Sequence, residues 1–311
     1  MKVSVIIVNY NTSHLLQSCI DSVNSFETET ENEFVIVDNN SADGSKDVIN
    51  KLVSGNNNVK SVFLDSNVGF AKANNRGFKV CGGDYVLVLN PDVVFTESVF
   101  LKLIDYSNDS GVGALGAKLI GEKGDFQYGY YQKHPSLMQY VLFYSVLAKP
   151  FIGKIKYENA FLNFRIDKDD RNLQTVSQIP GAFIFIRREI YSGFKGFNET
   201  FFLFFEDVDL SFRISRKYKL YIADIKVKHL GASSMMRDAD NNIYGFYVLS
   251  MLNFYKLNYS LISYINLKFI VLINTLLKIL YESIKMLFKM NKPGVIKVHK
   301  YILTNLFGKN G

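Results

Sequence analysis

The sequence predicts an α/β fold in which a parallel sheet is covered by helices on both faces. Three observations support this prediction. Short apolar segments alternate with segments of helical spacing through the first 90 residues, as they do in βαβ units. The apolar segments lack polar alternation, so both faces of the sheet should be buried. Polar residues follow these segments directly, at the strand ends where open parallel sheets bind their ligands.

Each expected element has a local reason. Short apolar runs predict buried strands, and polar or glycine residues mark the helix starts, with Ser13 as the expected N-cap of the first helix. The expected strands cover residues 3–8, 34–37, 59–64 and 85–89, and the expected helices run from 13 to 23, from 45 to 53 and from 67 to 80.

The second half of the chain has a different character. Residues 125–175 are rich in aromatic residues and lysine and show weak periodicity, which predicts loops or an inserted segment. Beyond them we expect a strand at 180–186, a helix that starts at Glu206 after an aromatic run, and short strands at 220–223 and 226–228 that His229 follows directly.

Composition excludes several classes of protein. The 311 residues are 48% hydrophobic and 21% charged, which is enough for a core and excludes global disorder. The two cysteines, Cys19 and Cys81, are too few for a disulfide scaffold or a structural zinc site, and their apolar surroundings predict buried, reduced thiols. Because Met1 leads straight into a strand, we expect no signal peptide and a cytoplasmic location.

The net charge of +7 belongs to the tail of the chain. Residues 251–311 hold nine lysines, no arginine and one acid, a net charge of +8, which leaves −1 for the first 250 residues. A binder of nucleic acid would carry its basic charge across an aromatic platform rather than on an apolar tail. We therefore expect no nucleic acid among the partners.

The same tail is strongly apolar. Its uncharged runs, 257–267 and 269–277, are each too short for a membrane span, which needs about 20 apolar residues. Polar residues recur at helical spacing at Thr275, Lys278, Glu282, Lys285 and Lys289. This pattern predicts an amphipathic helix with a lysine stripe, ended by Pro293, that suits an anionic membrane surface. Packing within the protein, oligomerisation and a tilted span stay open as alternatives.

Polar residues follow four successive strands. Asn9 and Tyr10 come after the first strand, Asp38 after the second, Asn67 after the third and Asp92 after the fourth. Because these ends meet at one edge of a parallel sheet, they predict a single ligand crevice. The first strand is not followed by the G-x-G-x-x-G of a dinucleotide site, and the chain lacks the G-x-x-x-x-G-K-[ST] of a P-loop.

Asp92 and His229 are candidate metal ligands. Mg²⁺ or Mn²⁺ takes one or two carboxylates and completes its shell with water and phosphate oxygens, which suits Asp92 at a strand end. An imidazole beside one carboxylate also suits Mn²⁺. The alternatives are a helix-cap or turn role for Asp92 and a purely structural role for His229.

Glu206 and Asp207 form a second acidic centre. Together with Asp209 they lie in the first turn of the expected helix, where the helix dipole favours acids, so capping is one interpretation. The apolar residues 201–205 precede them, and apolar surroundings tend to raise the pKa of a carboxyl group, as a general base requires. Both interpretations stay open at this point.

Together these segments resemble a known family. The matching stretches are 3–11, 37–45, 67–77, 87–93, 180–182, 197–210 and 229–233, which occur in the family's order. The chain resembles the family 2 inverting glycosyltransferases of the GT-A fold, and most closely their bacterial rhamnosyltransferase-like members. Asn90 departs from the commoner pattern, because the metal motif of the family frequently has an aspartate there.

The resemblance implies a role for each candidate residue. It implies that a nucleotide-sugar is bound by Tyr10, Asp38, Asn39, Asn67, Gly69, Arg76 and Asn90. It implies that a divalent cation, Mg²⁺ or Mn²⁺, is held by Asp92 and His229. It implies that Asp207 is the general base, that Glu206 beside it helps to bind the acceptor, and that Gly181, Ala182 and Asp209 lie on the acceptor side.

The resemblance also implies an activity and a domain plan. We expect inverting transfer of rhamnose or another hexose from a UDP- or dTDP-sugar to a glycan acceptor. With the basic tail, this suggests a polyprenyl-diphosphate-linked acceptor at the inner face of the membrane, in the synthesis of a bacterial surface polysaccharide. The expected domains are 1–245, divided into a nucleotide-sugar half (1–120) and an acceptor half (121–245), and the tail 246–311. A homo-oligomer stays open.

Three rival functions stay open at this stage. An enzyme that makes a sugar nucleotide would share the sheet, but it normally carries a glycine-rich basic loop after the first strand, where this chain has 9–12. A catalytically inactive module that binds nucleotide-sugar or glycan would keep the donor residues and show no turnover. A nucleic-acid binder is opposed by the position of the basic charge.

Overall fold

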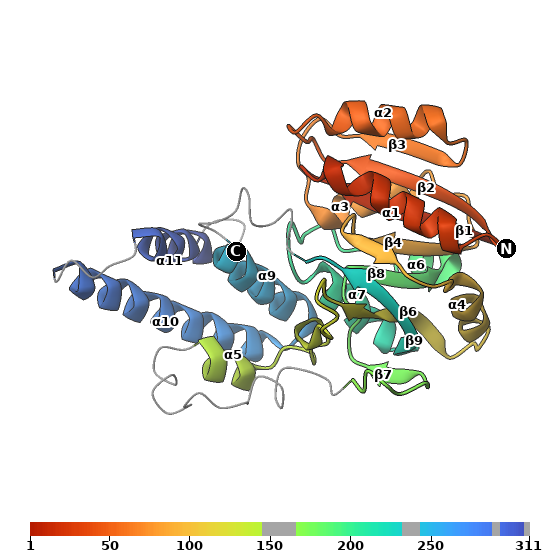
Figure 1. The fold of residues 1–311 in the computed structure, drawn as a ribbon. Coiled ribbons are helices and arrows are strands. Elements are labelled where there is room, and N and C mark those ends of the chain that lie inside the picture. The colour runs from red at the N-terminus through yellow and green to blue at the C-terminus, as the bar shows by residue number, and fades with distance from the viewer. Residues whose placement is uncertain (145–165, 232–242, 288–292, 308–311) are drawn as a thin grey trace. The chain divides into compact units, whose positions relative to one another are not determined.

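The computed structural model describes residues 1–144, 166–231, 243–287 and 293–307. The chain divides into two compact units. Unit 1 holds Met1–His134, Asn163–Phe202 and Glu206–Ser234, and unit 2 holds Pro135–Leu162, Leu203–Phe205 and Met235–Gly311. Unit 1 contains the sheet, and unit 2 contains a group of helices (Figure 1).

A mixed, mostly parallel sheet forms the centre of unit 1. Within the described residues it has nine strands in the order β3-β2-β1-β4-β8-β6-β9-β5, and β7 pairs with β9. Strands β1 to β4 pair in parallel with one another, whereas β8 runs antiparallel to both β4 and β6. The strands are β1 (Lys2–Asn9), β2 (Glu31–Asp38), β3 (Val59–Phe63), β4 (Tyr85–Leu89), β5 (Val93–Phe95), β6 (Val112–Ile120), β7 (Gln174–Val176), β8 (Phe183–Arg187) and β9 (Lys219–His229).

The predicted alternation of strands and helices in the first 90 residues is confirmed. Helix α1 (Ser13–Phe26) buries one apolar stripe, and α3 (Phe70–Phe78) packs on β1 and β2. The second predicted helix is α2 (Ser45–Gly55). All five residues of β4 are buried, as a strand covered on both faces should be. Cys19 and Cys81 are buried free thiols, as predicted.

Several elements differ from the prediction. The residues expected as two short strands form the single strand β9, because Asp224 in its middle pairs with the buried Lys118 at 2.9 Å instead of breaking the strand. Strand β8 begins at Phe183 rather than at 180, because a turn precedes it in which the Phe183 N–H donates to the Pro180 carbonyl. Strands β5 and β6 and helix α4 (Phe100–Ser107) were not predicted.

The segment with weak periodicity contains some regular structure. It holds the short helix η1 (Tyr128–Tyr130), helix α5 (Leu137–Tyr144) and strand β7, while residues 145–165 lie outside the described residues. Two helices follow β8, namely α6 (Arg188–Gly193) and α7 (Glu206–Ser215). The start of α7 at Glu206 confirms that prediction.

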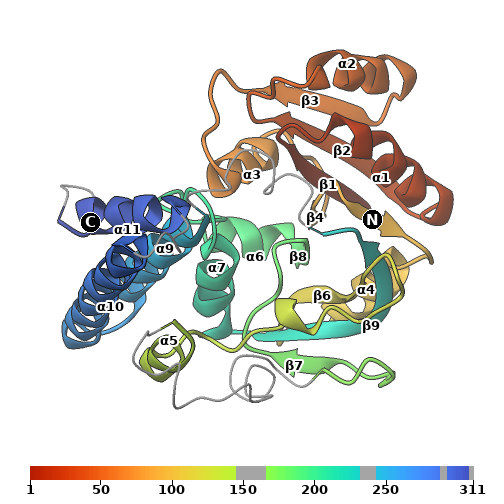
Figure 2. The ribbon, with the colours of Figure 1, turned by 60° about the vertical axis from the view of Figure 1, so that its left-hand side comes forward.

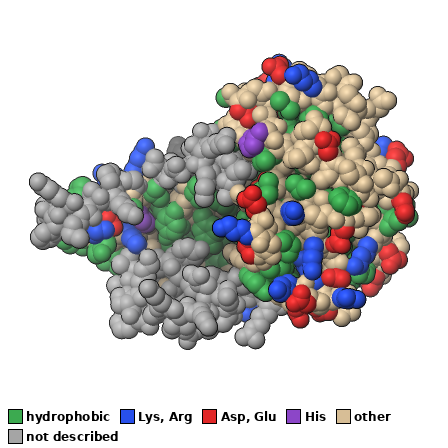
Figure 3. Space-filling view, in the orientation of Figure 1, with side chains coloured by type: hydrophobic (Ala, Val, Ile, Leu, Met, Phe, Trp, Pro, Cys, Tyr) green, Lys and Arg blue, Asp and Glu red, His purple; other side chains and the backbone are tan. Residues whose placement is uncertain are grey.

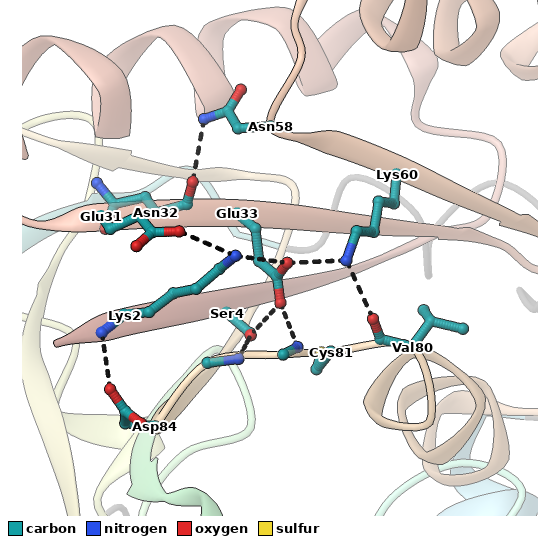
Figure 4. A network of polar contacts seen from close by, with 12 residues as sticks. Lys2, Ser4, Glu31, Asn32, Glu33, Asn58, Lys60, Val80, Cys81 and Asp84 are labelled. Carbon is teal, nitrogen blue, oxygen red and sulfur yellow. Dashed lines mark hydrogen bonds and ion pairs between the residues drawn. The ribbon is translucent and has the colours of Figure 1, made fainter.

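A buried carboxylate ties the amino ends of the first strands together (Figure 4). Glu33 in β2 accepts hydrogen bonds from Ser4 Oγ at 2.6 Å, from the Gly82 N–H and from Lys60 Nζ at 2.9 Å, and Lys2 Nζ lies 3.3 Å away. Burial alone would raise the pKa of Glu33, but these donors outweigh it and lower the pKa to about 2. The network stabilises one end of the sheet and leaves the carboxyl ends of the strands for a ligand site.

In the described part of unit 2, helices α9 (Ile243–Asn258), α10 (Leu261–Leu287) and α11 (Pro293–Leu306) pack against one another (Figure 2). The tail is helical, as predicted. The described part of α10 reaches Leu287, and residues 288–292, where the amphipathic helix was expected to end, lie outside the described residues. Pro293 is the first residue of α11, a position where its missing N–H costs little.

Helix α10 gives further detail on two features of the tail. Within the described residues, Leu261–Met286 is long and apolar enough to cross a membrane, although its separate uncharged runs are short. The predicted polar stripe is not uniformly exposed, because Thr275 is 1% exposed and Glu282 is 6% exposed, with Lys285 Nζ 3.2 Å from its carboxylate. The exposed side carries apolar residues at helical spacing: Ile262, Ile265, Phe269, Ile273, Leu276, Leu280 and Ile284.

The surface of unit 1 has a different character. In the face that Figure 3 presents, acidic and basic side chains are mixed over the unit instead of forming one basic field. This agrees with the near-zero net charge of the first 250 residues.

Candidate active site

One buried amide joins the carboxyl ends of β1 and β2. Asn9 Nδ2 donates to Asp38 Oδ1 and to Ser45 Oγ, both at 2.8 Å, and Asn9 Oδ1 accepts from Thr12 Oγ1 at 2.8 Å. The second Asp38 oxygen accepts from the Ser41 N–H at 3.1 Å. Both carboxylate oxygens of Asp38 are therefore held by hydrogen bonds, so this side chain has a fixed orientation at the edge of the sheet.

The loop that opens α3 is tied to the same edge. Asn39 Nδ2 donates to Asn67 Oδ1 at 2.8 Å, and Asn39 Oδ1 accepts from the Val68 N–H at 2.9 Å. Gly69 has a φ of +83°, and a Cβ placed there would lie 2.3 Å from the Phe202 carbonyl oxygen. Only glycine fits this position, so the predicted residues Asn39, Asn67 and Gly69 form one close-packed group.

The segment 180–182 contacts both the end of β4 and the start of α7. The Asn90 N–H donates to the Ala182 carbonyl at 3.0 Å, and the Gly181 N–H donates to Asp207 Oδ2 at 2.8 Å. Asn90 and Asp207 therefore contact neighbouring residues of the same short segment, Ala182 and Gly181.

Glu206 and Asp207 are adjacent acids with different surroundings. Glu206 is 7% exposed, and its Oε2 has no hydrogen-bond partner within the described residues. Burial and the neighbouring Asp207 raise the pKa of Glu206 to about 8. Burial also raises the pKa of Asp207, but the Gly181 and Val208 N–H groups donate to its two oxygens and favour the ionised form. The two carboxyl groups therefore differ, because two backbone N–H groups favour the ionised form of Asp207, whereas Glu206 Oε2 has no such donor within the described residues.

Asp92, just after β4, and His229, at the end of β9, lie close together, and both have side chains of a kind that binds metal ions. His229 Nε2 lies 3.5 Å from Asp92 Oδ1, which is buried and without a hydrogen-bond partner within the described residues. Burial lowers the pKa of His229, and the Asp92 carboxylate opposes this shift. No group of three or more His, Cys, Asp or Glu that could hold a metal occurs in the described part of the chain. A carboxylate and an imidazole nevertheless fit Mg²⁺ or Mn²⁺, which keeps water and phosphate oxygens in its shell.

Three predicted residues lie outside these groups. Tyr10 follows β1 and is partly buried. Arg76 is exposed in the last turn of α3, about two helical turns from Gly69. The Asp209 carboxylate is buried and pairs with Arg213 Nε at 2.7 Å, and Arg213 also donates to the Phe194 carbonyl, so Asp209 contributes to the packing of α7.

Two kinds of residue at these strand ends were not predicted. Ser41 and Ser45 hold Asn9 in place, and the polar turn 38–45 that contains them was the available signal. Gln127 contacts both the ring and the backbone of His229, and it lies in the segment whose periodicity was too weak to interpret.

Comparison with known proteins gives the chain its family. Residues 4–193 match the model of glycosyl transferase family 2. Over 253 residues, 77% of this chain and 79% of the relative, the chain is 27% identical to the N-acetylglucosaminyl-diphospho-decaprenol L-rhamnosyltransferase of Mycobacterium tuberculosis. A shorter match of 126 residues, 40% of this chain and 20% of the relative, is 29% identical to a poly(ribitol-phosphate) beta-glucosyltransferase of Bacillus spizizenii.

Solved structures confirm the fold. The mannosyltransferase PcManGT of Pyrobaculum calidifontis, solved with GDP-Man and Mn²⁺, has a TM-score of 0.57 at 15% identity and covers 99% of this chain and 87% of its own. GalNAc-T7, solved with UDP, GalNAc and Mn²⁺, has a TM-score of 0.58 at 13% identity and covers 82% of this chain and 48% of its own. The predicted GT-A fold is confirmed. The chain is a glycosyltransferase and belongs to glycosyl transferase family 2.

Proposed function

We propose that this glycosyltransferase moves rhamnose or another hexose from a UDP- or dTDP-sugar to a hydroxyl of a lipid-linked glycan acceptor, with inversion at the anomeric carbon. The observation that carries the proposal is the geometry of the acidic pair: two backbone N–H groups align Asp207, while Glu206 Oε2 is buried without a hydrogen-bond partner within the described residues and burial raises the pKa of Glu206. The Mycobacterium tuberculosis relative supports the choice of sugar and acceptor, since its name specifies an L-rhamnosyltransferase acting on N-acetylglucosaminyl-diphospho-decaprenol.

In this mechanism Asp207 takes the proton from the acceptor hydroxyl. The hydrogen bonds from Gly181 and Val208 fix the carboxylate, so little reorganisation is needed when the proton moves. The neutral Glu206 beside it can donate a hydrogen bond to the acceptor. The acceptor oxygen then attacks the anomeric carbon from the side opposite the nucleotide, which inverts the configuration.

On the donor side, the fixed carboxylate of Asp38 and the Asn39–Asn67 pair provide acceptors and donors for the base and ribose of the nucleotide. Asp92 and His229 would hold a divalent cation at the diphosphate. When bound, the cation stabilises the charge that grows on the departing diphosphate.

We further propose that α10 lies against the inner face of the cell membrane. Its polarity is inverted relative to a helix of a water-soluble bundle, because Asn274, Thr275 and Glu282 are buried whereas Ile265 is 52% exposed and Leu280 is 57% exposed. Polar groups that face the interior of a helix group and apolar groups that face outward are expected where the surroundings are lipid. The net charge of +8 in residues 251–311 favours an anionic surface. A membrane position would hold the enzyme beside a lipid-linked acceptor.

A transfer assay tests the activity. The full chain is incubated with short-chain polyprenyl-diphosphate N-acetylglucosamine and with UDP-, dTDP- and GDP-sugars, and the product is identified by mass spectrometry and its anomeric configuration by NMR. We expect one donor class to give a product with inverted configuration. A product with retained configuration would contradict the mechanism, and donor binding without transfer to any acceptor would favour the inactive binding module.

A thermal-shift panel tests the donor class and the cation separately. Donor at 100 times its Kd should stabilise the protein by about 2.7 kcal/mol. We expect this stabilisation with UDP- or dTDP-sugar in the presence of Mn²⁺, and we expect Asp92→Asn to remove the dependence on Mn²⁺. Equal shifts in the variant and the wild type would exclude Asp92 as the cation ligand.

Dye labelling of single introduced cysteines tests the membrane proposal, since Cys19 and Cys81 are both buried. The positions are Ile265→Cys and Leu280→Cys on the exposed apolar side of α10, with Ser110→Cys in unit 1 as the matched control. On vesicles that contain phosphatidylserine, an environment-sensitive dye at both α10 positions should report an apolar environment, and the control should not change. A dye that stays in water at all three positions would refute the proposal.

A further inference from the structure

The amide of Gln127 makes two contacts with His229 whose directions can be assigned. Gln127 Nε2 donates to the His229 backbone carbonyl at 2.9 Å, and Gln127 Oε1 lies 2.8 Å from His229 Nδ1. A backbone carbonyl can only accept, so the NH₂ group must face it and the oxygen must face the ring. Since an amide oxygen can only accept, His229 Nδ1 carries the hydrogen.

The position of Gln127 is itself fixed. The Gln127 N–H donates to the Leu119 carbonyl at the end of β6, and the neighbouring residue Phe126 pairs with Ile120 of the same strand. On the other side, the Tyr130 ring meets the His229 ring edge to face, with the centroids 4.9 Å apart. The imidazole is therefore held both in its plane and along one edge.

This tautomer determines whether His229 Nε2 can act as an acceptor. In a neutral imidazole with hydrogen on Nδ1, the Nε2 atom presents a lone pair. The Nε2 atom lies 3.5 Å from the buried Asp92 Oδ1, which has no hydrogen-bond partner within the described residues. Two acceptors this close together in a buried place call for a cation between them.

We propose that Gln127 is a positioning residue that holds His229 in the Nδ1–H tautomer, so that His229 Nε2 and Asp92 together bind a divalent cation. A ligating histidine generally donates its other ring N–H to a second protein group, and loss of that group typically lowers metal affinity by about 10–100-fold. The inference rests on the proposed cation site at Asp92 and His229, and it adds the residue that orients the histidine of that site.

The first measurement is the binding of Mn²⁺ alone to the full chain, by electron paramagnetic resonance and calorimetry. We expect Gln127→Met, which has similar size and no strong acceptor, to weaken Mn²⁺ binding by about 10–100-fold. Gln127→Glu keeps an acceptor for Nδ1–H and should stay within about threefold of the wild type. Gln132→Met is the matched control, because Gln132 lies five residues further on and donates to the Gly129 carbonyl instead.

The second measurement reads the tautomer without metal or activity. The chain has four histidines, so ¹⁵N spectra of the imidazoles are simple to assign with His229→Gln as a reference. The wild type should show His229 as the Nδ1–H form, and Gln127→Met should shift it toward the Nε2–H form, which can donate to Asp92. Gln127→Glu should restore the Nδ1–H form.

The outcomes separate this inference from the site on which it rests. If Asp92→Asn and His229→Gln lose Mn²⁺ but Gln127→Met binds it like the wild type, the role of Gln127 is refuted and the cation site stands. If Gln127→Glu loses as much affinity as Gln127→Met, the contact with the His229 carbonyl matters and the tautomer does not. If Asp92→Asn and His229→Gln bind Mn²⁺ like the wild type, the cation site itself is refuted.

Discussion

Replacing Glu206 by glutamine should stabilise the protein, and the stabilisation should grow with pH. The pKa of Glu206 is raised from 4.5 to about 8 by burial and by Asp207, so at pH 7 the folded state binds a proton that the unfolded state has released. The free energy of unfolding therefore falls as pH rises from about 4.5 to about 8, by about 1.4 kcal/mol per pH unit. Glutamine has a neutral head of similar size and does not titrate, so the variant should gain about 3 kcal/mol relative to the wild type between pH 4.5 and pH 7.

Urea denaturation at pH 5, 6, 7 and 8 measures this difference. The chain has no tryptophan, so the signal is the circular dichroism of its tyrosines and its backbone. Glu189→Gln is the matched control, because its side chain is 74% exposed and should show no such trend. A difference between Glu206→Gln and wild type that stays constant from pH 5 to pH 8 would refute the reasoning, because Glu206 would then be ionised in the folded protein.

Three further predictions concern residues that stabilise the fold. Glu33→Gln should lose about 3 kcal/mol of stability at pH 7, because the pKa of Glu33 is lowered to about 2, and the loss should shrink as pH falls from 4.5 toward 2 in the same denaturation assay. Gly69→Ala should lower the melting temperature and donor affinity more than Gly124→Ala, since both have positive φ but only a Cβ at Gly69 would overlap a carbonyl, at Phe202; equal losses would contradict this. Asp209→Asn should cost about 3 kcal/mol of stability in a denaturation assay, because it breaks the buried ion pair with Arg213, and it should leave kcat unchanged. A large loss of kcat in the folded variant would instead indicate that Asp209 contacts the acceptor.

The first half of the fold could be predicted because most of its strands carry continuous apolar runs and its helices start at recognisable residues. Strand β6 could not, because Lys118 interrupts its apolar run. Only the folded chain shows that this lysine is fully buried and bonded to Asp224 and to the carbonyls of Lys168 and Asp170. Asp224 of this pair lies within β9, where it falls between the two short strands predicted at 220–223 and 226–228.

The site was predicted as a set of residues but not as a set of contacts. The strand-end rule found Asn9, Asp38 and Asp92, because the ends of parallel strands must meet at one edge. It could not find the bond between the Gly181 N–H and Asp207, since these residues lie 26 positions apart and belong to different elements. Gln127 was missed for the same reason, because its contact with His229 spans 102 positions.

The polarity of α10 shows a further limit of sequence periodicity. The spacing of Thr275, Lys278 and Glu282 identified one side of the helix correctly. Spacing does not say which side faces inward, and the structure shows that part of this polar side is buried, because Thr275 and Glu282 are buried within the described structure.

The central claim is that Asp207, and not its neighbour Glu206, is the base that activates the acceptor. Turnover of Asp207→Asn and Glu206→Gln, measured at pH 7 with saturating donor and acceptor alongside donor binding by calorimetry, tests it most directly. We predict that Asp207→Asn loses about 10²–10⁴-fold in kcat while its donor Kd stays within about threefold, and that Glu206→Gln keeps kcat within about tenfold. Wild-type turnover by Asp207→Asn, or an equal loss in both variants, would contradict the claim.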